Sequence, residues 1–309
     1  MTTRIPLGPS NATIESGSVL FVGTATTVIR LGPFTLLTDP NFLHAGDHAH
    51  LGYGLRSRRL TNPAIEIDDL PRLDACVLSH FHGDHWDEVA TARLPRMLPV
   101  LTTPHAASAL RARGFGRALA LRTWEDAVLE KGVTRLRVTA LPGRHGPAGV
   151  ARLLPQVMGS LVEVGEEGLG SRYRIYVSGD TLVFDDLREI PERFPDVDLG
   201  LFHLGGTRVL GVLVTMDDRQ GIEAIRIIRP RLAIPIHYDD YTVFKSPLED
   251  FVRAVERSGL GDRVRYLGRG ERYDFPIPSR RIREAEVARP DWPRHAGPGL
   301  LEDDPTRLH

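Results

Sequence analysis

The chain has 309 residues, of which 41% are hydrophobic and 26% are charged, values typical of a soluble globular protein. Its formal net charge is −1 and it has no sustained basic run, which argues against nucleic acid and anionic lipid as partners. No apolar run approaches the roughly 18 residues that span a bilayer, and the first residues lack the basic start of a signal peptide. The single cysteine, Cys76, leaves no pair for an intramolecular disulfide. We therefore expect a cytoplasmic protein without a membrane span.

The first half of the chain predicts mainly strands joined by tight turns. Runs 19–23 and 26–38, the second broken at Gly32-Pro33, are rich in β-branched residues, and 74–80 is a short apolar strand. A helix is expected from Pro104 to Gly114. Residues 133–140 alternate as a half-buried strand does, and 160–164 and 172–178 flank a glycine-rich turn.

From about residue 217 the pattern changes to helices alternating with strands. Asp217 is a plausible N-cap for a helix that Pro230 ends, and 232–236 reads as a strand. A last helix is expected between a Ser246 cap and Gly259. Hairpins followed by alternation predict an α/β fold, an αββα sandwich of two mixed β-sheets flanked by helices. We expect one domain over 1–276 and a Pro- and Arg-rich arm or tail over 277–309.

The stretch "LSHFHGDHWD", residues 78–87, concentrates residues that bind metal ions. His80 and His82 lie two apart beyond a strand, so extended geometry aims them to the same side. Asp84 and His85 follow Gly83, whose freedom in φ is expected to turn the chain and point them elsewhere. This division predicts one pair of ligands for each of two neighbouring cations.

Three further candidates each follow a predicted strand, and an aspartate carboxylate among them can bridge two ions. Imidazole and carboxylate ligands favour zinc, with manganese or iron as alternatives. Two bound cations would activate a water for hydrolysis, and Asp84 is the candidate catalytic residue that orients this water or accepts its proton. The expected first site is His80, His82, His145 and Asp180, and the second is Asp84, His85, His237 and Asp180.

This set of residues resembles, in number and order, the motifs of the metallo-β-lactamase superfamily, over roughly residues 18–270. "TDPNF", "SGDT" and "IPIHYD" are most similar to the branch with ascorbate-phosphate lactonases and N-acyl-phosphatidylethanolamine phospholipase D-like hydrolases. The resemblance implies an αββα sandwich with the site at one edge, and it assigns Asp39 of "LLTDP" the role of holding a ligand or loop in place. Gly23-Thr24-Ala25 and Thr215-Met216 depart from the pattern of that branch, which often has a histidine at each place.

The segment 41–60 follows Asp39 directly and is expected near the mouth of the site. Its histidines and arginines are candidates for binding a phosphate or carboxylate of the substrate, although a solvated polar loop explains them as well. His203, equally explained as a core histidine, and Tyr238 are further candidates. The candidates in the segment are His44, His48, His50, Arg56, Arg58 and Arg59.

The function that these residues favour is a metallohydrolase that cleaves an ester, lactone or phosphodiester bond in a small organic substrate. A nuclease is the first alternative, although the charge balance argues against it. An iron-dependent redox enzyme of the same superfamily and a metal-dependent scaffold without catalysis are the others. The sequence does not indicate the oligomeric state.

Overall fold

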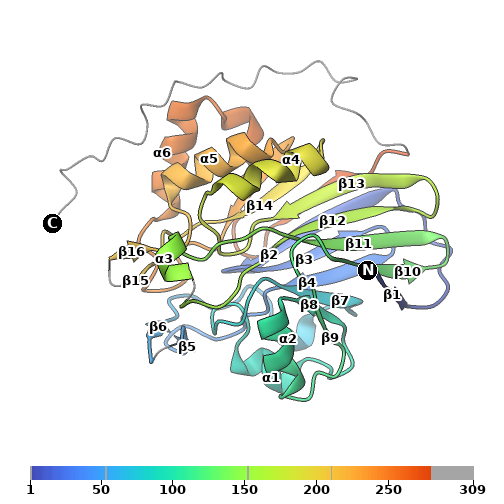
Figure 1. The fold of residues 1–309 in the computed structure, drawn as a ribbon, viewed down its shortest axis with the longest axis horizontal. Coiled ribbons are helices and arrows are strands. Elements are labelled where there is room, and N and C mark those ends of the chain that lie inside the picture. The colour runs from blue at the N-terminus through green and yellow to red at the C-terminus, as the bar shows by residue number, and fades with distance from the viewer. Residues whose placement is uncertain (1, 53, 152, 210, 280–309) are drawn as a thin grey trace.

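The computed structural model describes residues 2–52, 54–151, 153–209 and 211–279, and two β-sheets lie face to face within them (Figure 1). The arm expected at 277–309 lies outside the described residues from residue 280 onward. Among the described helices, none has the length and apolar composition that crossing a membrane requires.

The first sheet has seven strands and is mixed. Its antiparallel part, from β10 to β13, contains a hairpin at Lys131-Gly132 and the predicted hairpin at the glycine-rich turn. Its parallel part, β13-β14-β17, comes from the region where strands alternate with helices. The strand order is β1 (Thr3–Pro6), β10 (Asp126–Lys131), β11 (Thr134–Leu141), β12 (Gly159–Glu166), β13 (Gly170–Val177), β14 (Leu199–His203) and β17 (Leu232–Ile236).

The second sheet also has seven strands and is mixed. The predicted run 26–38 divides at Gly32, which has φ 55°, into β3 and β4, and the chain continues from there into parallel strands. All four residues of β7 are buried, because both faces of this central strand are covered. The strand order is β18 (Arg272–Pro276), β2 (Ser16–Gly23), β3 (Thr26–Leu31), β4 (Phe34–Thr38), β7 (Ala75–Leu78), β8 (Val100–Thr102) and β9 (Ala118–Ala120).

Helices cover the outer face of each sheet, and apolar side chains fill the layers between (Figure 1). One core lies between the sheets, a second under the helices on the first sheet, and a third, which contains Cys76, under those on the second. This arrangement confirms the predicted αββα sandwich. On the first sheet lie α4 (Glu189–Arg193), α5 (Asp218–Ile228) and α6 (Leu248–Ser258); on the second lie α1 (Glu88–Arg93) and α2 (Pro104–Arg111); the short 3₁₀ turns are η1 (Ile67–Asp69), η2 (Asp185–Arg188) and η3 (Gly261–Arg263).

The helix ends agree with the prediction except at one cap. Asp217 caps α5 by accepting a hydrogen bond from the Gln220 amide, and Gly259 ends α6 with φ 70°. Ser246 was predicted to cap α6, and this is wrong. Its hydroxyl accepts a hydrogen bond from the Asp218 amide at 3.2 Å, so it serves the start of the neighbouring helix α5.

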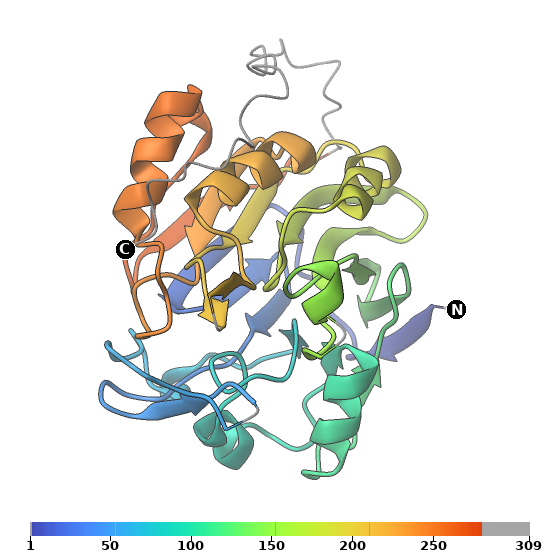
Figure 2. The same cartoon turned by 60° about the vertical axis from the view of Figure 1, so that its left-hand side comes forward.

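Two small hairpins and a short helix lie together at one end of the sandwich (Figure 2). They occupy long connections between strands of the main sheets, where binding residues are commonly carried. They are the hairpins β5 (His48–His50)–β6 (Arg56–Arg58) and β15 (Arg208–Val209)–β16 (Val212–Leu213), and the helix α3 (Ala148–Ala151).

Candidate metal centre

The seven predicted ligands all follow strands that end near these hairpins. His80, His82, Asp84 and His85 follow β7, and His145, Asp180 and His237 follow β11, β13 and β17. The structure brings them together in two adjoining groups, and within each group the candidate ligand atoms lie within 4.8 Å of one another. The two groups adjoin: the ring centroid of His80 in the first lies 4.1 Å from that of His85 in the second.

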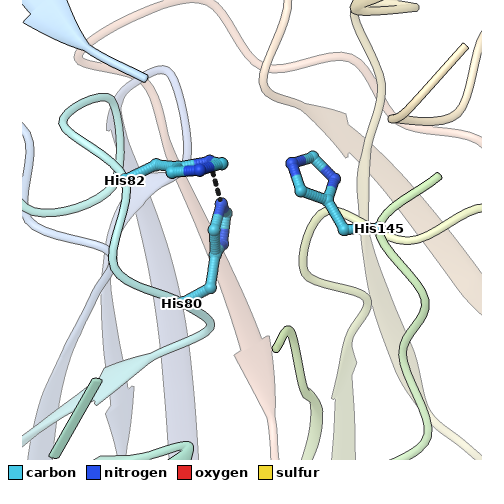
Figure 3. Close-up of side chains that lie close together, drawn as sticks. All are labelled: His80, His82 and His145. Carbon is cyan, nitrogen blue, oxygen red and sulfur yellow. Dashed lines mark hydrogen bonds between the residues drawn. The ribbon is translucent and has the colours of Figure 1, made fainter. Parts of the chain in front are cut away.

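The first group consists of three histidines, His80, His82 and His145, whose rings converge on one point (Figure 3). His80 Nε2 lies 3.0 Å from His82 Nδ1, and the His145 ring centroid lies 5.2 Å from that of His80 and 5.3 Å from that of His82. Burial lowers the pKa of His80 well below its ordinary value and lowers the pKa of His82 to about 4. The imidazoles are therefore neutral near pH 7 and keep the lone pairs that a cation needs.

The second group combines two carboxylates, Asp84 and Asp180, with two imidazoles, His85 and His237. His85 Nε2 lies 3.4 Å from Asp180 Oδ2, and His237 Nε2 lies 3.6 Å from Asp84 Oδ2. Burial alone would raise the pKa of Asp180, but the attraction of His237 and His85 holds it well below its ordinary value. Both carboxylates of this group are anionic at neutral pH.

The groups contain buried polar atoms that lack hydrogen-bond partners within the described part of the chain. An unsatisfied buried donor or acceptor costs about 1–3 kcal/mol, and the two groups contain five of them. Bound cations and a water beside them would satisfy these atoms, so the residues fit a metal centre on their own chemistry. The atoms are His82 Nε2, Asp84 Oδ1, His85 Nε2, Asp180 Oδ1 and His237 Nε2.

Backbone carbonyls fix the orientation of two ligand rings. His145 donates from Nδ1 to the Val214 carbonyl at 2.9 Å, and His237 donates from Nδ1 to the Leu204 carbonyl at 3.0 Å. In the neutral ring these hydrogen bonds set the tautomer, so that Nε2 carries the lone pair.

Asp39 lies directly behind the second group and contacts one of its ligands, His85. Its Oδ1 accepts hydrogen bonds from the amide and hydroxyl of Ser79 at 2.7 and 2.9 Å and lies 3.6 Å from His85 Nδ1. Burial would raise its pKa, but the attraction of His85 and His203 lowers that pKa to about 2. An anionic Asp39 holds the Nδ1 side of His85, so that Nε2 faces Asp84 and Asp180.

Gly83 separates the two pairs of ligands, but not by the predicted means. It does not have a positive φ; instead, a Cβ built on it would lie 2.6 Å from the His50 amide nitrogen. Its own amide donates to the His50 carbonyl at 2.9 Å. Glycine is thus required for close packing of the ligand loop against β5. The expected turn is present, but it does not depend on a φ that only glycine adopts readily.

Five of the predicted substrate residues lie exposed near the hairpin β5–β6, and three do not. The exposed five are His44, His48, His50, Arg56 and Arg58. His44 Nε2 lies 3.1 Å from the Glu66 carboxylate. The other four occupy the solvent face of the hairpin, where His48 pairs with Arg58 and His50 with Arg56.

Arg59, His203 and Tyr238 are corrections, because each is buried and engaged inside the protein. Arg59 donates from Nε to the Thr61 carbonyl, and its guanidinium lies over the Tyr241 ring. The two His203 ring nitrogens lie 3.1 Å from the Ser178 hydroxyl and 3.4 Å from Asp39 Oδ2. The Tyr238 hydroxyl donates to the Leu267 carbonyl at 3.3 Å. Whether a side chain in a strand or loop is exposed depends on which segments of the folded chain pack against it. The sequence alone did not show these tertiary contacts.

Asp87 organises the loop beside the site, and the sequence analysis did not select it. Its carboxylate caps α1 through the Ala90 amide at 2.7 Å and also accepts from the amides of Phe42 and Leu43. Burial raises its pKa to about 6. Its place directly before a helix was a recognisable N-cap signal.

Asp240 ties the His237 loop to three distant segments, and no local pattern marked it. It accepts hydrogen bonds from the Thr24 amide at 2.5 Å, from Arg269 at 2.7 Å and from the Thr61 hydroxyl. Thr24 in turn accepts from the His237 amide at 2.7 Å, where His237 has φ 65°. This network holds a ligand in a backbone conformation that non-glycine residues rarely adopt.

The fold and the two groups agree with a comparison to known families, in which residues 35–238 match the model of the "Beta-lactamase superfamily domain". The chain belongs to this superfamily. A UPF0173 metal-dependent hydrolase of Aeropyrum pernix is 29% identical over 232 residues, which cover 70% of this chain and 87% of that protein. The name of this relative corresponds to the class predicted from the sequence.

Two further proteins are similar to this chain, one in sequence and one in structure. The N-acyl-phosphatidylethanolamine-hydrolyzing phospholipase D 1 of Caenorhabditis elegans is 25% identical over 240 residues, covering 74% of this chain and 65% of that protein. The crystal structure of isothiocyanate hydrolase from Delia radicum gut bacteria matches with a TM-score of 0.69 and 20% identity, covering 84% of this chain and all of that chain. At this identity the structural match supports the fold alone.

Proposed function

We propose that this metal-dependent hydrolase of the beta-lactamase superfamily holds one divalent cation in each group and cleaves an ester, lactone or phosphodiester bond in a small organic substrate. The observation that carries the proposal is the pair of adjoining, buried donor groups with five unsatisfied ligand atoms. Nitrogen-rich donors in the first group and mixed nitrogen and carboxylate donors in the second favour zinc.

Each group of residues would bind one of the two cations. His80, His82 and His145 would hold one cation, and Asp84, His85, His237 and Asp180 the other. We assign Asp180 as the bridge between them, because it lies 3.4 Å from His85 Nε2 in the second group, and the His85 ring adjoins the His80 ring of the first group at 4.1 Å. When bound, the cations supply Lewis acidity, which lowers the pKa of water from near 16 toward about 7.

Asp84 is the residue of this chain that would accept the proton of the water. Its Oδ2 faces the imidazoles of His237 and His85, at 3.6 and 3.9 Å, whereas its buried Oδ1 has no hydrogen-bond partner among the described residues. Oδ1 would accept a hydrogen bond from a water beside the cations and orient it, while Oδ2 stays on the side of the two imidazoles. This is the arrangement that general-base assistance requires.

Metal analysis together with a substrate panel tests this proposal. We expect about two zinc ions per chain, and turnover of 4-nitrophenyl acetate, simple lactones or bis(4-nitrophenyl) phosphate. Asp84→Asn is expected to lower kcat by roughly 10²- to 10⁴-fold, with far-UV circular dichroism unchanged. Two iron ions with turnover only in the presence of oxygen and a reductant would instead favour the redox alternative. Preferential cleavage of plasmid DNA would favour a nuclease.

The solvent face of the hairpin β5–β6 favours a substrate with an anionic group. It carries His48, His50, Arg56 and Arg58, and neither guanidinium forms an ion pair with another described residue. The hairpin adjoins the first group, because a Cβ on Gly52 would lie 3.9 Å from His82 Nε2. A carboxylate or phosphate bound by this face would lie beside the cations.

A matched pair of esters measures this contribution. The double variant Arg56→Gln/Arg58→Gln is expected to raise KM for mono(4-nitrophenyl) succinate about 5- to 10-fold, since each exposed ion pair is worth roughly 0.2–1 kcal/mol. KM for neutral 4-nitrophenyl acetate should change less than about twofold. Arg188→Gln/Arg257→Gln, which removes two exposed arginines elsewhere, is the control. Equal effects on both esters would contradict the assignment.

A further inference from the structure

One connection in the chain contacts ligands of both groups. It runs from the end of β14 to the start of α5 and includes the hairpin β15–β16. Near its start, the Leu204 carbonyl accepts a hydrogen bond from His237. Near its end, the Val214 carbonyl accepts from His145, and the Thr215 hydroxyl donates to Asp180 Oδ2 at 3.0 Å.

The two ends of this connection are joined to each other. The Val214 amide donates to the Thr207 carbonyl at 2.9 Å, and the Gly206 amide donates to the Met216 carbonyl at 3.0 Å. Gly206 has φ 56°, and a Cβ there would lie 2.7 Å from the Ser246 Cβ. The two ends of the connection are therefore packed in place, and they present fixed hydrogen-bonding groups to the ligands.

The two oxygens of the Asp180 carboxylate have different surroundings. Its Oδ2 is engaged by the Thr215 hydroxyl, whereas its Oδ1 is buried and has no hydrogen-bond partner among the described residues. The terminal torsion of an aspartate is broad and roughly two-fold. The hydrogen bond from Thr215 to Oδ2 adds to two ion-pair contacts, His85 Nε2 with Oδ2 at 3.4 Å and His237 Nδ1 with Oδ1 at 3.5 Å, and it is the one hydrogen bond that favours this orientation of the carboxylate among the described residues.

We propose that Val214–Thr215 is a brace that fixes His145 and Asp180 relative to each other, and that Thr215 is a positioning residue that keeps Asp180 Oδ1 turned toward the cations. The inference rests on the proposed function, in which both groups bind cations. Thr215 is fully buried and Val214 nearly so. The hydroxyl of Thr215 therefore has no solvent to bond with, and Asp180 is the acceptor that the structure gives it.

The chain offers a control for the loss of a buried hydroxyl. Thr207 lies in the same connection, is also buried, and has a hydroxyl without a hydrogen-bond partner among the described residues. Threonine and valine have nearly the same shape, so both substitutions preserve packing. Only Thr215→Val removes a hydrogen bond to a ligand.

Zinc affinity measured by competition with a chromophoric chelator, on protein stripped and reloaded with Zn²⁺, tests the brace. Thr215→Val is expected to weaken the binding of at least one zinc by about 10- to 100-fold, the usual effect of losing an outer partner of a ligand. Thr215→Ser, which keeps the hydroxyl, should stay within about threefold of the unsubstituted protein. Thr207→Val should bind both ions unchanged.

The outcomes separate this inference from the proposed function. If the unsubstituted protein binds two zinc ions and Thr215→Val binds them equally well, the brace is wrong and the metallohydrolase proposal stands. If the unsubstituted protein binds no zinc, both fail. Should Thr215→Val not fold, as judged by circular dichroism, Thr215→Ala and Thr215→Ser provide the same comparison of hydroxyl loss and retention.

Discussion

Asp180→Ala is expected to abolish turnover and to lower the bound metal below one ion per chain. The carboxylate lies 3.4 Å from His85 Nε2 and 3.5 Å from His237 Nδ1 and receives the Thr215 hydroxyl. Removing it takes away one of the two negative charges in the second group and the assigned bridge to the first. Loss of an outer partner costs about 10- to 100-fold, so loss of this ligand should exceed that range.

Metal content by mass spectrometry and turnover of the best ester from the panel measure the effect. Asp186→Ala is the matched control, because this aspartate is exposed six residues later in the chain. It should keep full metal content and activity. An Asp180→Ala protein that retains two metal ions and full turnover would show that the assigned bridge is wrong.

Gly83→Ala is expected to damage the centre without altering any ligand. The added Cβ would lie 2.6 Å from the amide nitrogen and 2.8 Å from the carbonyl oxygen of His50. Backbone atoms cannot swing aside as a flexible side chain does, so the loop carrying His82 and Asp84 has to move. Overpacking of this kind costs about 1–3 kcal/mol, and the displaced ligands should bind zinc at least about 10-fold more weakly.

Thermal unfolding of the zinc-free protein and zinc affinity measure these two effects separately. Gly116→Ala is the control, because nothing lies within 4 Å of a Cβ built there and its φ is not positive. It should leave the unfolding temperature and the zinc affinity unchanged. Equal behaviour of the two variants would mean that the ligand loop and β5 are not in close contact.

Patterns within short segments predicted the fold well. Alternation in the strand at 133–140, the glycine turn before 172–178 and the Asp217 cap each depend on neighbours within a few residues. The misassigned Ser246 cap shows the limit of such patterns. Its hydroxyl was free to serve either its own helix or another one, and packing against α5 decided the choice.

The candidate centre was predictable in composition but not in its supports. Asp39 was identified through a resemblance, Thr215 was noted only as a departure from the pattern of the similar branch, and Asp240 was not selected. The hydrogen bonds of Asp240 to Thr24 and of Thr215 to Asp180 join residues 216 and 35 positions apart. Contacts over such distances leave no periodic or spacing signal in a single chain.

The sequence by itself determined which side chains can bind metal and that they follow strands, because ligand chemistry is a property of the residue and strand ends are marked by local pattern. The tertiary structure alone decided which of the basic and aromatic candidates face solvent. Arg59, His203 and Tyr238 are buried because packed neighbours cover them, whereas Arg56 and Arg58 stay exposed on the outer face of a hairpin. It also decided why residue 83 is glycine: two backbone segments meet there at a distance that leaves no room for a Cβ.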